Sequence, residues 1–487
     1  MTQEAPKLLE PTEAASALVR ALDGQGRDFT IADAAAKSGL ALRDAERGLH
    51  ALVSEYRGHL RVTNEGELLF RFPNGFTKPW ITRSWLERVG ARIGGGFVGL
   101  LRFIVRAWVA ISLIGYAAIF IALVIGLAFA RSSGSNSRND RGFGFDLGFV
   151  FFRVIADALF WTFHPFSPVS VAYYDPGWTR NRQVGRAKEK GPPFYEKVNR
   201  FFFGPEDPPV DPLAMEKRIL AEIRAQKGRI GLADVMRVTG LPRDEADPLM
   251  ARLMLDYDGS VEVSEDGGIS YRFAELRKTV EESPTPRPKP VWAKRQSLTP
   301  LTGNGIGTNL LIGGLNGFNL LMSLWALDHH LTLGNLALLF ERVPFAKLPA
   351  VGTPIALGVV PLVFSIALFA LPLARALYRP FKARKIAREN ARREVLRAVL
   401  DGVDHGGVTD EALKAAWHSA TGKQPDSKEL TREVVALGGD VDLDRVEDGV
   451  RYRFPDLEAE ATALAAEREA AGDEEAKVGP VVFSSET

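Results

Sequence analysis

The chain has 487 residues, a formal net charge of +1 at pH 7, and 46% hydrophobic and 25% charged residues. It contains no cysteine, which excludes disulfides, a cysteine zinc site and thiolate ligation of an iron–sulfur cluster. These proportions are ordinary for a soluble protein, but they average two kinds of segment, because long uncharged runs alternate with charged ones.

The segment at residues 30–72 recurs without a gap at residues 231–273. Internal repetition of this kind indicates that one small domain occurs more than once in the chain. Identical residues at matching positions include Asp33 and Asp234, Gly39 and Gly240, Tyr56 and Tyr257, and Gly66 and Gly267.

The first copy has the pattern of a winged helix. Apolar residues in residues 30–56 follow helical spacing in two runs that meet at Gly39, the residue type that a tight helix-turn-helix corner needs. Beyond these runs the apolar residues alternate around the turn Asn64-Glu65-Gly66, which predicts a β-hairpin. The second copy repeats this order, and residues 393–454 predict a diverged third copy with a longer wing.

Four segments are candidates for crossing a membrane. Three are uncharged and exceed the ~20 apolar residues that a spanning helix needs. The fourth, residues 147–166, has the length but contains Arg153 and Asp157. It is either a spanning helix in which these charges form an intramembrane ion pair at i,i+4, or an interfacial or re-entrant helix. The uncharged runs are residues 107–130, 296–327 and 348–374.

Basic residues precede the first and third of these segments and follow the second and fourth. The positive-inside rule places such flanks in the cytoplasm, which favours four crossings. The first residues lack the apolar core of a cleavable signal peptide. We therefore predict a multi-pass protein of the bacterial cytoplasmic (inner) membrane, with all winged-helix domains in the cytoplasm.

The predicted fold is an α-helical integral membrane protein with about four transmembrane helices and three small α+β winged-helix-like cytoplasmic domains. An aromatic and proline-rich linker lies on the bilayer or packs against a domain, a second proline-rich linker is extended, and an acidic helical tail continues into disorder. The domains are residues 1–75, 213–275 and 385–456, the membrane helices 97–130, 147–166, 304–327 and 350–374, the linkers 191–212 and 276–298, and the tail 457–487.

The order of these segments, with "FFFGPEDPP" at residues 201–209 and "GGLNGFNLL" at residues 313–321, resembles a group of uncharacterised cyanobacterial and chloroplast integral membrane proteins. Members are sometimes labelled iron–sulfur cluster biosynthesis proteins. The resemblance covers residues 30–393 and implies the architecture and the membrane location. It brings no catalytic or binding residues with it, and the chain lacks the cysteines that carrying a cluster would need.

The charges of the three candidate recognition helices argue against nucleic-acid binding. The first, residues 41–57, has as many arginines as carboxylates, and the other two, residues 242–257 and 426–437, have more carboxylates than basic residues. Phosphate neutralisation supplies most of the nonspecific affinity for DNA, so such helices favour protein partners or a homo-oligomer instead.

The third apolar run carries the other candidate site. Small residues allow helices to approach closely, and asparagines hydrogen-bond across them. We interpret three asparagines and two glycines of this run as a helix-packing face, or alternatively as a contact for a lipid headgroup or an ion. These residues are Asn309, Gly313, Asn316, Gly317 and Asn319.

The sequence offers no catalytic, cofactor-binding or metal-binding set, so we expect no enzyme and no cofactor. The favoured interpretation is an integral membrane scaffold or regulatory protein whose repeated winged-helix domains act in protein–protein interaction or self-association. The alternatives are a membrane-tethered nucleic-acid-binding regulator and a small transporter regulated by its cytosolic domains. The bilayer itself is a partner in all three.

Overall fold

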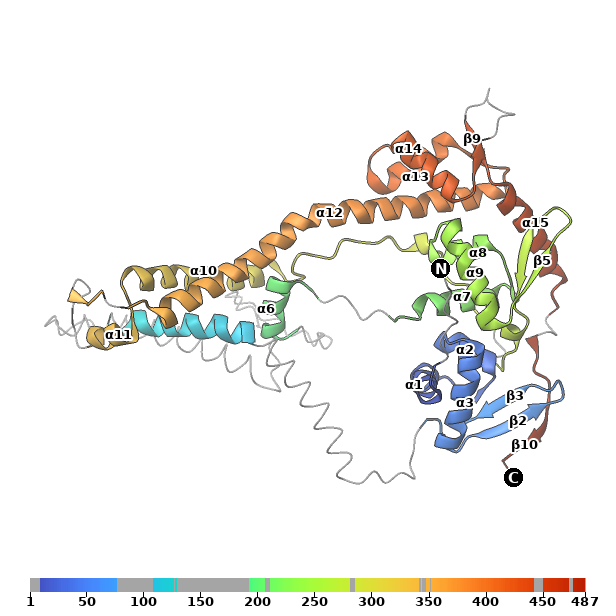
Figure 1. Ribbon diagram of the computed structural model, residues 1–487, viewed down its shortest axis with the longest axis horizontal. Helices are drawn as coiled ribbons and strands as arrows, with labels where there is room; N and C mark the ends of the chain where they lie inside the picture. Colours follow the sequence, from blue (N-terminus) through green and yellow to red (C-terminus); the bar gives the residue numbers. More distant parts are fainter. Residues whose placement is uncertain are drawn as a thin grey trace, which may run out of the picture. The chain divides into compact units, whose positions relative to one another are not determined.

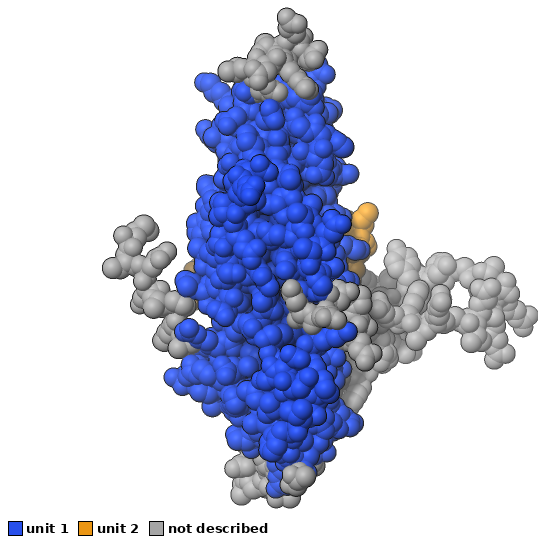
Figure 2. All heavy atoms as spheres, turned by 90° about the vertical axis from the view of Figure 1, so that its right-hand side faces the viewer, with its two compact units in different colours: residues 1–82, 209–297, 383–487 blue, residues 83–208, 298–382 orange. Residues whose placement is uncertain are grey.

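A computed structural model of the chain describes residues 9–76, 108–126, 128, 192–205, 211–280, 285–340, 343, 347–350, 352–441, 450–472 and 476–486. The chain forms two compact units (Figure 2). Unit 1 comprises residues 1–82, 209–297 and 383–487, and unit 2 comprises residues 83–208 and 298–382.

Unit 1 begins with three helices and a small antiparallel sheet, which we call module 1 (Figure 1). β3 lies between β1 and β2, and β2 pairs with β3 across the predicted turn. Gly39 ends α2 with a φ of 79°, a conformation that glycine adopts without strain, so the predicted corner is confirmed. The elements are α1 (Pro11–Leu22), β1 (Asp28–Phe29), α2 (Ile31–Ser38), α3 (Leu42–Tyr56), β2 (His59–Thr63) and β3 (Leu68–Arg71).

Module 2 has the same order of elements. α8 and α9 have 8 and 15 residues, the same lengths as α2 and α3, and Gly240 ends α8 with a φ of 78°. The similarity of the two sequences is therefore matched by similar local structure. The elements are α7 (Ala214–Ala225), β4 (Arg229–Ile230), α8 (Leu232–Thr239), α9 (Arg243–Tyr257), β5 (Ser260–Val263) and β6 (Ile269–Arg272).

Module 3 is built on the end of a long helix. α12 (Val360–Val403) passes without a break through the predicted end of a membrane span at residue 374 and the predicted start of a domain at residue 385. The helix continues across both positions because no glycine occurs between Gly358 and Gly402 and the charged residues there are good helix formers. The remaining elements are β7 (Val408–Thr409), α13 (Asp410–Thr421), α14 (Ser427–Ala436), β8 (Asp440–Val441) and β9 (Arg451–Arg453).

The described C-terminal residues, 455–472 and 476–486, belong to unit 1. α15 (Pro455–Ala470) is the predicted acidic helix, but the predicted disorder beyond it is wrong. Residues 481–484 form β10 (Val481–Ser484), which pairs antiparallel with β2 and extends the first sheet to the order β1-β3-β2-β10. A free edge strand offers unpaired backbone groups, and β10 satisfies those of β2.

The three modules share one hydrophobic core. Each contributes the phenylalanine that follows its last strand, Phe72, Phe273 or Phe454, and all three side chains are 0% exposed. Leu457 of α15 joins the same core. Burial of apolar side chains is the main favourable term in folding, so unit 1 is one body rather than three independent domains.

Unit 2 contains the apolar helices. Three helices of the described residues are long and apolar enough to cross a membrane. The predicted segment 147–166, with Arg153 and Asp157, lies outside the described residues. The candidates are Trp108–Gly126, α10 (Ile306–Asp328) and Ile355–Val403, which joins a π-helical turn, η4 (Ile355–Val359), to α12; a shorter helix, α11 (Leu333–Phe340), follows α10.

The two predicted linkers are not free spacers. The first contains α6 (Phe194–Phe203), whose Val198 and Phe202 are fully buried against apolar side chains that include Leu113 and Ile312 of unit 2. The second linker is extended in residues 285–290 and holds two short 3-10 turns, η1 (Glu275–Arg277) and η2 (Val291–Ala293). Composition suggested linkers because both segments are rich in proline, which disfavours helix interiors.

Candidate functional site

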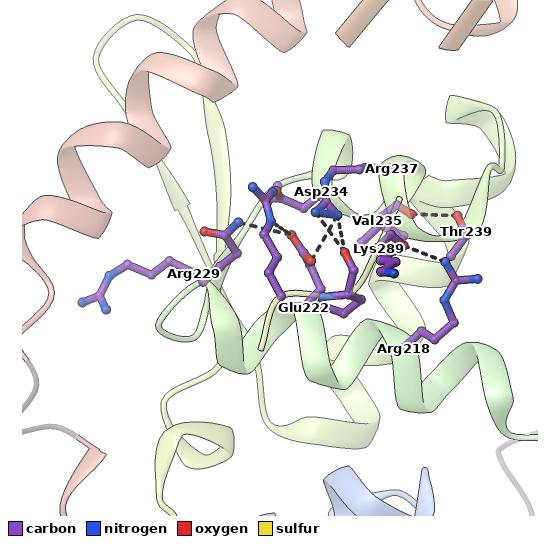
Figure 3. A network of polar contacts seen from close by, with 12 residues as sticks. Arg218, Glu222, Arg229, Asp234, Val235, Arg237, Thr239 and Lys289 are labelled. Atoms are coloured by element: carbon purple, nitrogen blue, oxygen red, sulfur yellow. Dashed lines mark hydrogen bonds and ion pairs between the residues drawn. The ribbon is translucent and has the colours of Figure 1, made fainter. Parts of the chain in front are cut away.

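A network of charged side chains lies at the centre of module 2 (Figure 3). Glu222 of α7 is 1% exposed. Its carboxylate accepts a hydrogen bond from Arg287 Nε at 2.8 Å and lies 3.5 Å from Arg237 Nη1. Arg287 Nη2 also donates to Asp234 Oδ1 at 3.1 Å. Buried carboxylates require partners of this kind, because desolvation of an unpaired charge is costly.

This network fastens the proline-rich segment to module 2. Arg237 donates to Pro288 O with both Nη1 and Nη2 at 3.0 Å, and Arg218 Nη2 donates to Lys289 O at 3.1 Å (Figure 3). Every buried carboxylate named in the network is paired with arginine. The network therefore holds residues 287–289 of the chain against module 2. Among these residues, no carboxylate is left without a partner to act as an acid or a base.

The first turn of α8 binds a second segment of the chain. Its preceding residue, Gly231, has no side chain to cap the helix, and Glu460 of α15 takes that role. The Glu460 carboxylate accepts hydrogen bonds from Leu232 N at 2.9 Å and Ala233 N at 2.8 Å. A Cβ at Gly231 would lie 2.0 Å from Glu460 Oε1, so glycine is the residue that lets the carboxylate approach. Burial raises the pKa of Glu460 to about 7, although both backbone hydrogen bonds act to lower it.

Arg468 holds the other end of α15. Its Nε and Nη2 donate to Arg229 O at 3.1 and 3.0 Å, and Nη2 also pairs with Asp234. Glu467 pairs with Ser270 Oγ of β6. α15 is thus fixed to module 2 along its length by charge-assisted hydrogen bonds, which are stronger than neutral ones.

The first turn of α2 in module 1 is used in the same way. Asp33, the counterpart of Asp234, is 1% exposed and accepts from Arg224 Nη2 and Thr279 Oγ1, each at 2.7 Å, and from Val280 N at 3.1 Å. Burial would raise the pKa of Asp33, but the Arg224 charge and the hydrogen bonds from Thr279 and Val280 outweigh it and lower the pKa. Thr30 Oγ1 also donates to Lys278 O at 2.9 Å.

These two sites share one feature. In each, the aspartate three residues after the cap position accepts hydrogen bonds from residues later in the chain, and at α8 the first-turn N–H groups also bind Glu460. Helix N-termini carry unsatisfied N–H groups and partial positive charge, so they favour carboxylates and other acceptors. Sequence reasoning recognised the repeated aspartates but missed Glu222, Arg287, Glu460 and Arg468 as their partners. The glycine at position 231, where the first copy has a capping threonine, was the available signal.

A cavity of about 370 Å³ lies between modules 1 and 2, and most of the charged residues that line it are acidic. Its basic residues are Arg43 and Lys278, and Lys278 already pairs with Glu275 at 2.8 Å and Glu67 at 2.5 Å. The acidic residues that line it are Glu46, Glu67, Asp256, Asp258 and Glu275. The cavity therefore offers no excess of positive charge to a phosphate group.

The basic residues of α9 are also engaged. Arg243, at its first turn, pairs with Asp456 of α15, and Arg252 pairs with Asp256 at 3.2 Å. On α14 the carboxylates of Glu429 and Glu433 pair with arginines of α12 at 2.6 and 2.7 Å. The charged side chains of α9 and α14 named here therefore form ion pairs within unit 1. This agrees with the lack of excess positive charge in the sequences of these helices.

The predicted asparagines of unit 2 connect apolar helices. Asn316 Nδ2 donates to Ser365 O of α12 at 3.0 Å, and Asn319 Nδ2 donates to Leu113 O of the helix Trp108–Gly126 at 2.8 Å. Both asparagines are 0% exposed. Asn309 Nδ2 bonds Thr302 Oγ1 at 3.0 Å, just before α10. Asn316 and Asn319 thus each form a hydrogen bond to a neighbouring helix.

Among the described residues, the glycines of that set do not lie at a close helix contact. A Cβ built at Gly317 has no described atom within 4 Å, and one at Gly313 meets only Phe201 at 3.7 Å, an ordinary contact. Spacing at i,i+4 placed both glycines on one face, but the helix turns a different face, that of Asn316 and Asn319, toward its neighbours.

Comparison with known proteins finds limited similarity. No family model matches the chain, and no solved structure matches it significantly. It is similar to an uncharacterized chloroplastic protein of Arabidopsis thaliana, with 26% identity over 278 residues, which cover 56% of this chain and 51% of the plant protein. The chain thus spans about half the length of that relative. The match supports the resemblance to a chloroplast and cyanobacterial group, and it carries neither a winged-helix nor an iron–sulfur assignment.

Proposed function

We propose that this chain is a non-enzymatic integral membrane scaffold or regulatory protein whose three modules are winged-helix domains that bind protein segments. The supporting observation is that modules 1 and 2 already bind peptide segments of their own chain. α2 and α8 each hold a later segment at their first turn, and β2 holds β10 by strand addition. Strand addition is a common way for a sheet to bind an extended peptide.

We place a partner site at the free edge of β5 in module 2. β5 is the counterpart of β2, and it ends its sheet in the described part of the chain. Val261 and Val263 on this strand are 46% and 67% exposed. An extended partner segment with apolar β-branched residues fits this edge, because β10, which fills the equivalent edge, has the sequence VVFS.

We further propose four membrane crossings. Modules 1 and 2 share one core, so they lie on one side of the membrane and the number of crossings between them is even. The helix Trp108–Gly126 supplies one, and we assign the second to residues 147–166, with Arg153 and Asp157 as its ion pair. The basic flanks place the modules on the cytoplasmic side of a bacterial inner membrane, and the plant relative is chloroplastic.

The test is purification of the full-length chain in mild detergent, followed by mass spectrometry of bound proteins and light scattering for oligomeric state. We expect a stoichiometric partner that Val263→Lys releases. Val435→Lys is the matched control, because Val435 is 64% exposed on α14 of module 3. A monomer without any stoichiometric protein refutes the scaffold proposal. Retention of the partner by Val263→Lys refutes the β5 site alone.

A further inference from the structure

A cavity of about 280 Å³ lies in unit 2 where α12 leaves its apolar stretch. It is formed by the end of α6, the residues that precede α10, and the side chains of α12 between residues 375 and 382. Three of its lining residues are basic, and none of the described lining residues is acidic. The lining residues used here are Phe203, Gly204, Leu301, Arg375, Arg379 and Lys382.

Arg375 is fixed at the wall of this cavity, and among the described residues it has no carboxylate partner. Its Nη1 donates to Leu301 O at 2.8 Å and its Nη2 to Phe201 O at 2.6 Å. Its Nε is buried and has no acceptor in the described part of the chain. A Cβ at Gly204 would lie 2.3 Å from Nη1, so glycine admits the guanidinium. Two neutral carbonyls orient the group, and no carboxylate among the described residues compensates its positive charge.

Arg379 and Lys382 add two exposed charges on the same face of α12. They follow Arg375 at four and seven residues, the spacing of neighbouring turns on one side of a helix. Both are exposed, and among the described residues neither has a carboxylate within ion-pair distance. The cavity therefore gathers three positive charges that nothing in the described structure neutralises.

Aromatic side chains place this cavity at the depth of lipid headgroups. Tyr378 and Phe381 are 74% and 65% exposed, and their ring centroids are 6.5 Å apart. Phe203, at the end of α6, is 56% exposed. Exposed aromatic residues beside the first charges after an apolar helix are typical of the membrane–water interface. Basic pockets next to membrane helices at this level bind anionic headgroups.

We propose that the cavity binds the phosphate or sulfate headgroup of an anionic membrane lipid. Arg379 and Lys382 donate charge-assisted hydrogen bonds to the headgroup oxygens, and Arg375 supplies a fixed positive charge. The acyl chains lie along the apolar part of α12, where Leu373 and Leu377 are 62% and 66% exposed. This site is separate from the protein-binding surfaces proposed for the modules.

The experiment uses the full-length chain in a neutral detergent, so that no anionic surface competes with the site. Phosphatidylglycerol, phosphatidylcholine and inorganic phosphate are titrated separately, with melting temperature and native mass spectrometry as readouts. We expect phosphatidylglycerol alone to bind and to raise the melting temperature. The double variant Arg379→Gln/Lys382→Gln should weaken this binding at least about tenfold, because charged hydrogen bonds are lost.

A matched control removes the same charge from the same helix. Arg384 and Lys385 are exposed and do not line the cavity, so Arg384→Gln/Lys385→Gln should keep the wild-type affinity. If both double variants weaken phosphatidylglycerol binding equally, the lipid does not bind in the cavity but is attracted to basic residues in general. Equal binding of phosphatidylcholine overturns the anionic headgroup, and equal binding of inorganic phosphate shows that the site takes a soluble anion instead.

Discussion

The variant Glu460→Gln tests how α15 is held on module 2. Glu460 is 5% exposed, and its carboxylate accepts from the backbone N–H groups of Leu232 and Ala233. Burial raises its pKa from 4.5 to about 7, against the effect of these hydrogen bonds and of the nearby Arg468, and the Asp234 charge adds to the rise. Glutamine has almost the same shape and carries no titratable proton at this position.

The sign of the effect follows from proton linkage. Between pH 4.5 and 7 the folded chain binds a proton at Glu460 that the open or unfolded chain has released. The stability of the docked α15 therefore falls as pH rises through this window and is constant above it. The rise of the pKa from 4.5 to about 7 corresponds to about 3 kcal/mol.

Hydrogen exchange at the first turn of α8 and along α15 measures this opening locally. Wild type and Glu460→Gln are compared at equal pH, which cancels the intrinsic pH dependence of exchange. Relative to the variant, we expect wild-type protection to fall about 100-fold between pH 4.5 and 7. Glu469→Gln removes a carboxylate from an exposed position of the same helix and should behave as wild type. The reasoning is refuted if the ratio of wild-type to variant protection stays constant or rises with pH. In that case the hydrogen bonds at the helix terminus and the charge of Arg468 affect the pKa of Glu460 more than burial does.

Three further outcomes are expected. Reporter fusions after Tyr195 and Thr285 should both report the cytoplasmic side; a Thr285 fusion that alone lies outside contradicts four crossings. In detergent melts Asn319→Ala should lower the melting temperature more than Gly317→Leu, because an interhelical hydrogen bond contributes ~0.6 kcal/mol whereas no described atom lies within 4 Å of a Cβ at Gly317. The reverse order supports the glycine-packing interpretation. Deleting residues 480–487 removes β10, exposes the β2 edge and should increase self-association in light scattering, and an unchanged monomer argues against that edge as a binding surface.

The elements of the modules could be predicted because their signals are local. A helical period that changes to alternation around Asn64-Glu65-Gly66 predicts a hairpin wherever the segment lies in the fold, and β2 and β3 pair across that turn. The long uncharged runs are equally local, since length and composition alone identify a helix that could cross a membrane. Both predictions rest on patterns within about 20 residues.

The segments between these elements could not be predicted, because their structure depends on distant partners. Residues 194–203 resemble a linker in composition, but Val198 and Phe202 find an apolar surface from other helices and form α6. Residues 472–477, after α15, are mostly acidic and polar, but the apolar residues 481–484 that follow find the edge of β2 to pair with. In both cases tertiary contacts supply the free energy that composition suggested was missing.

Thr30 and Gly231 occupy equivalent positions before α2 and α8, but the two helix starts are capped in different ways. In the first copy Thr30 caps α2 with its own side chain, accepting from Asp33 N at 2.9 Å. The second copy has no side-chain acceptor at this position, although glycine ranks close to threonine as a cap residue. Glu460 of α15 supplies the acceptor instead. The absence of a side chain at Gly231 thus leaves room for α15 to bind, and Gly231→Thr should restore the local cap but displace α15.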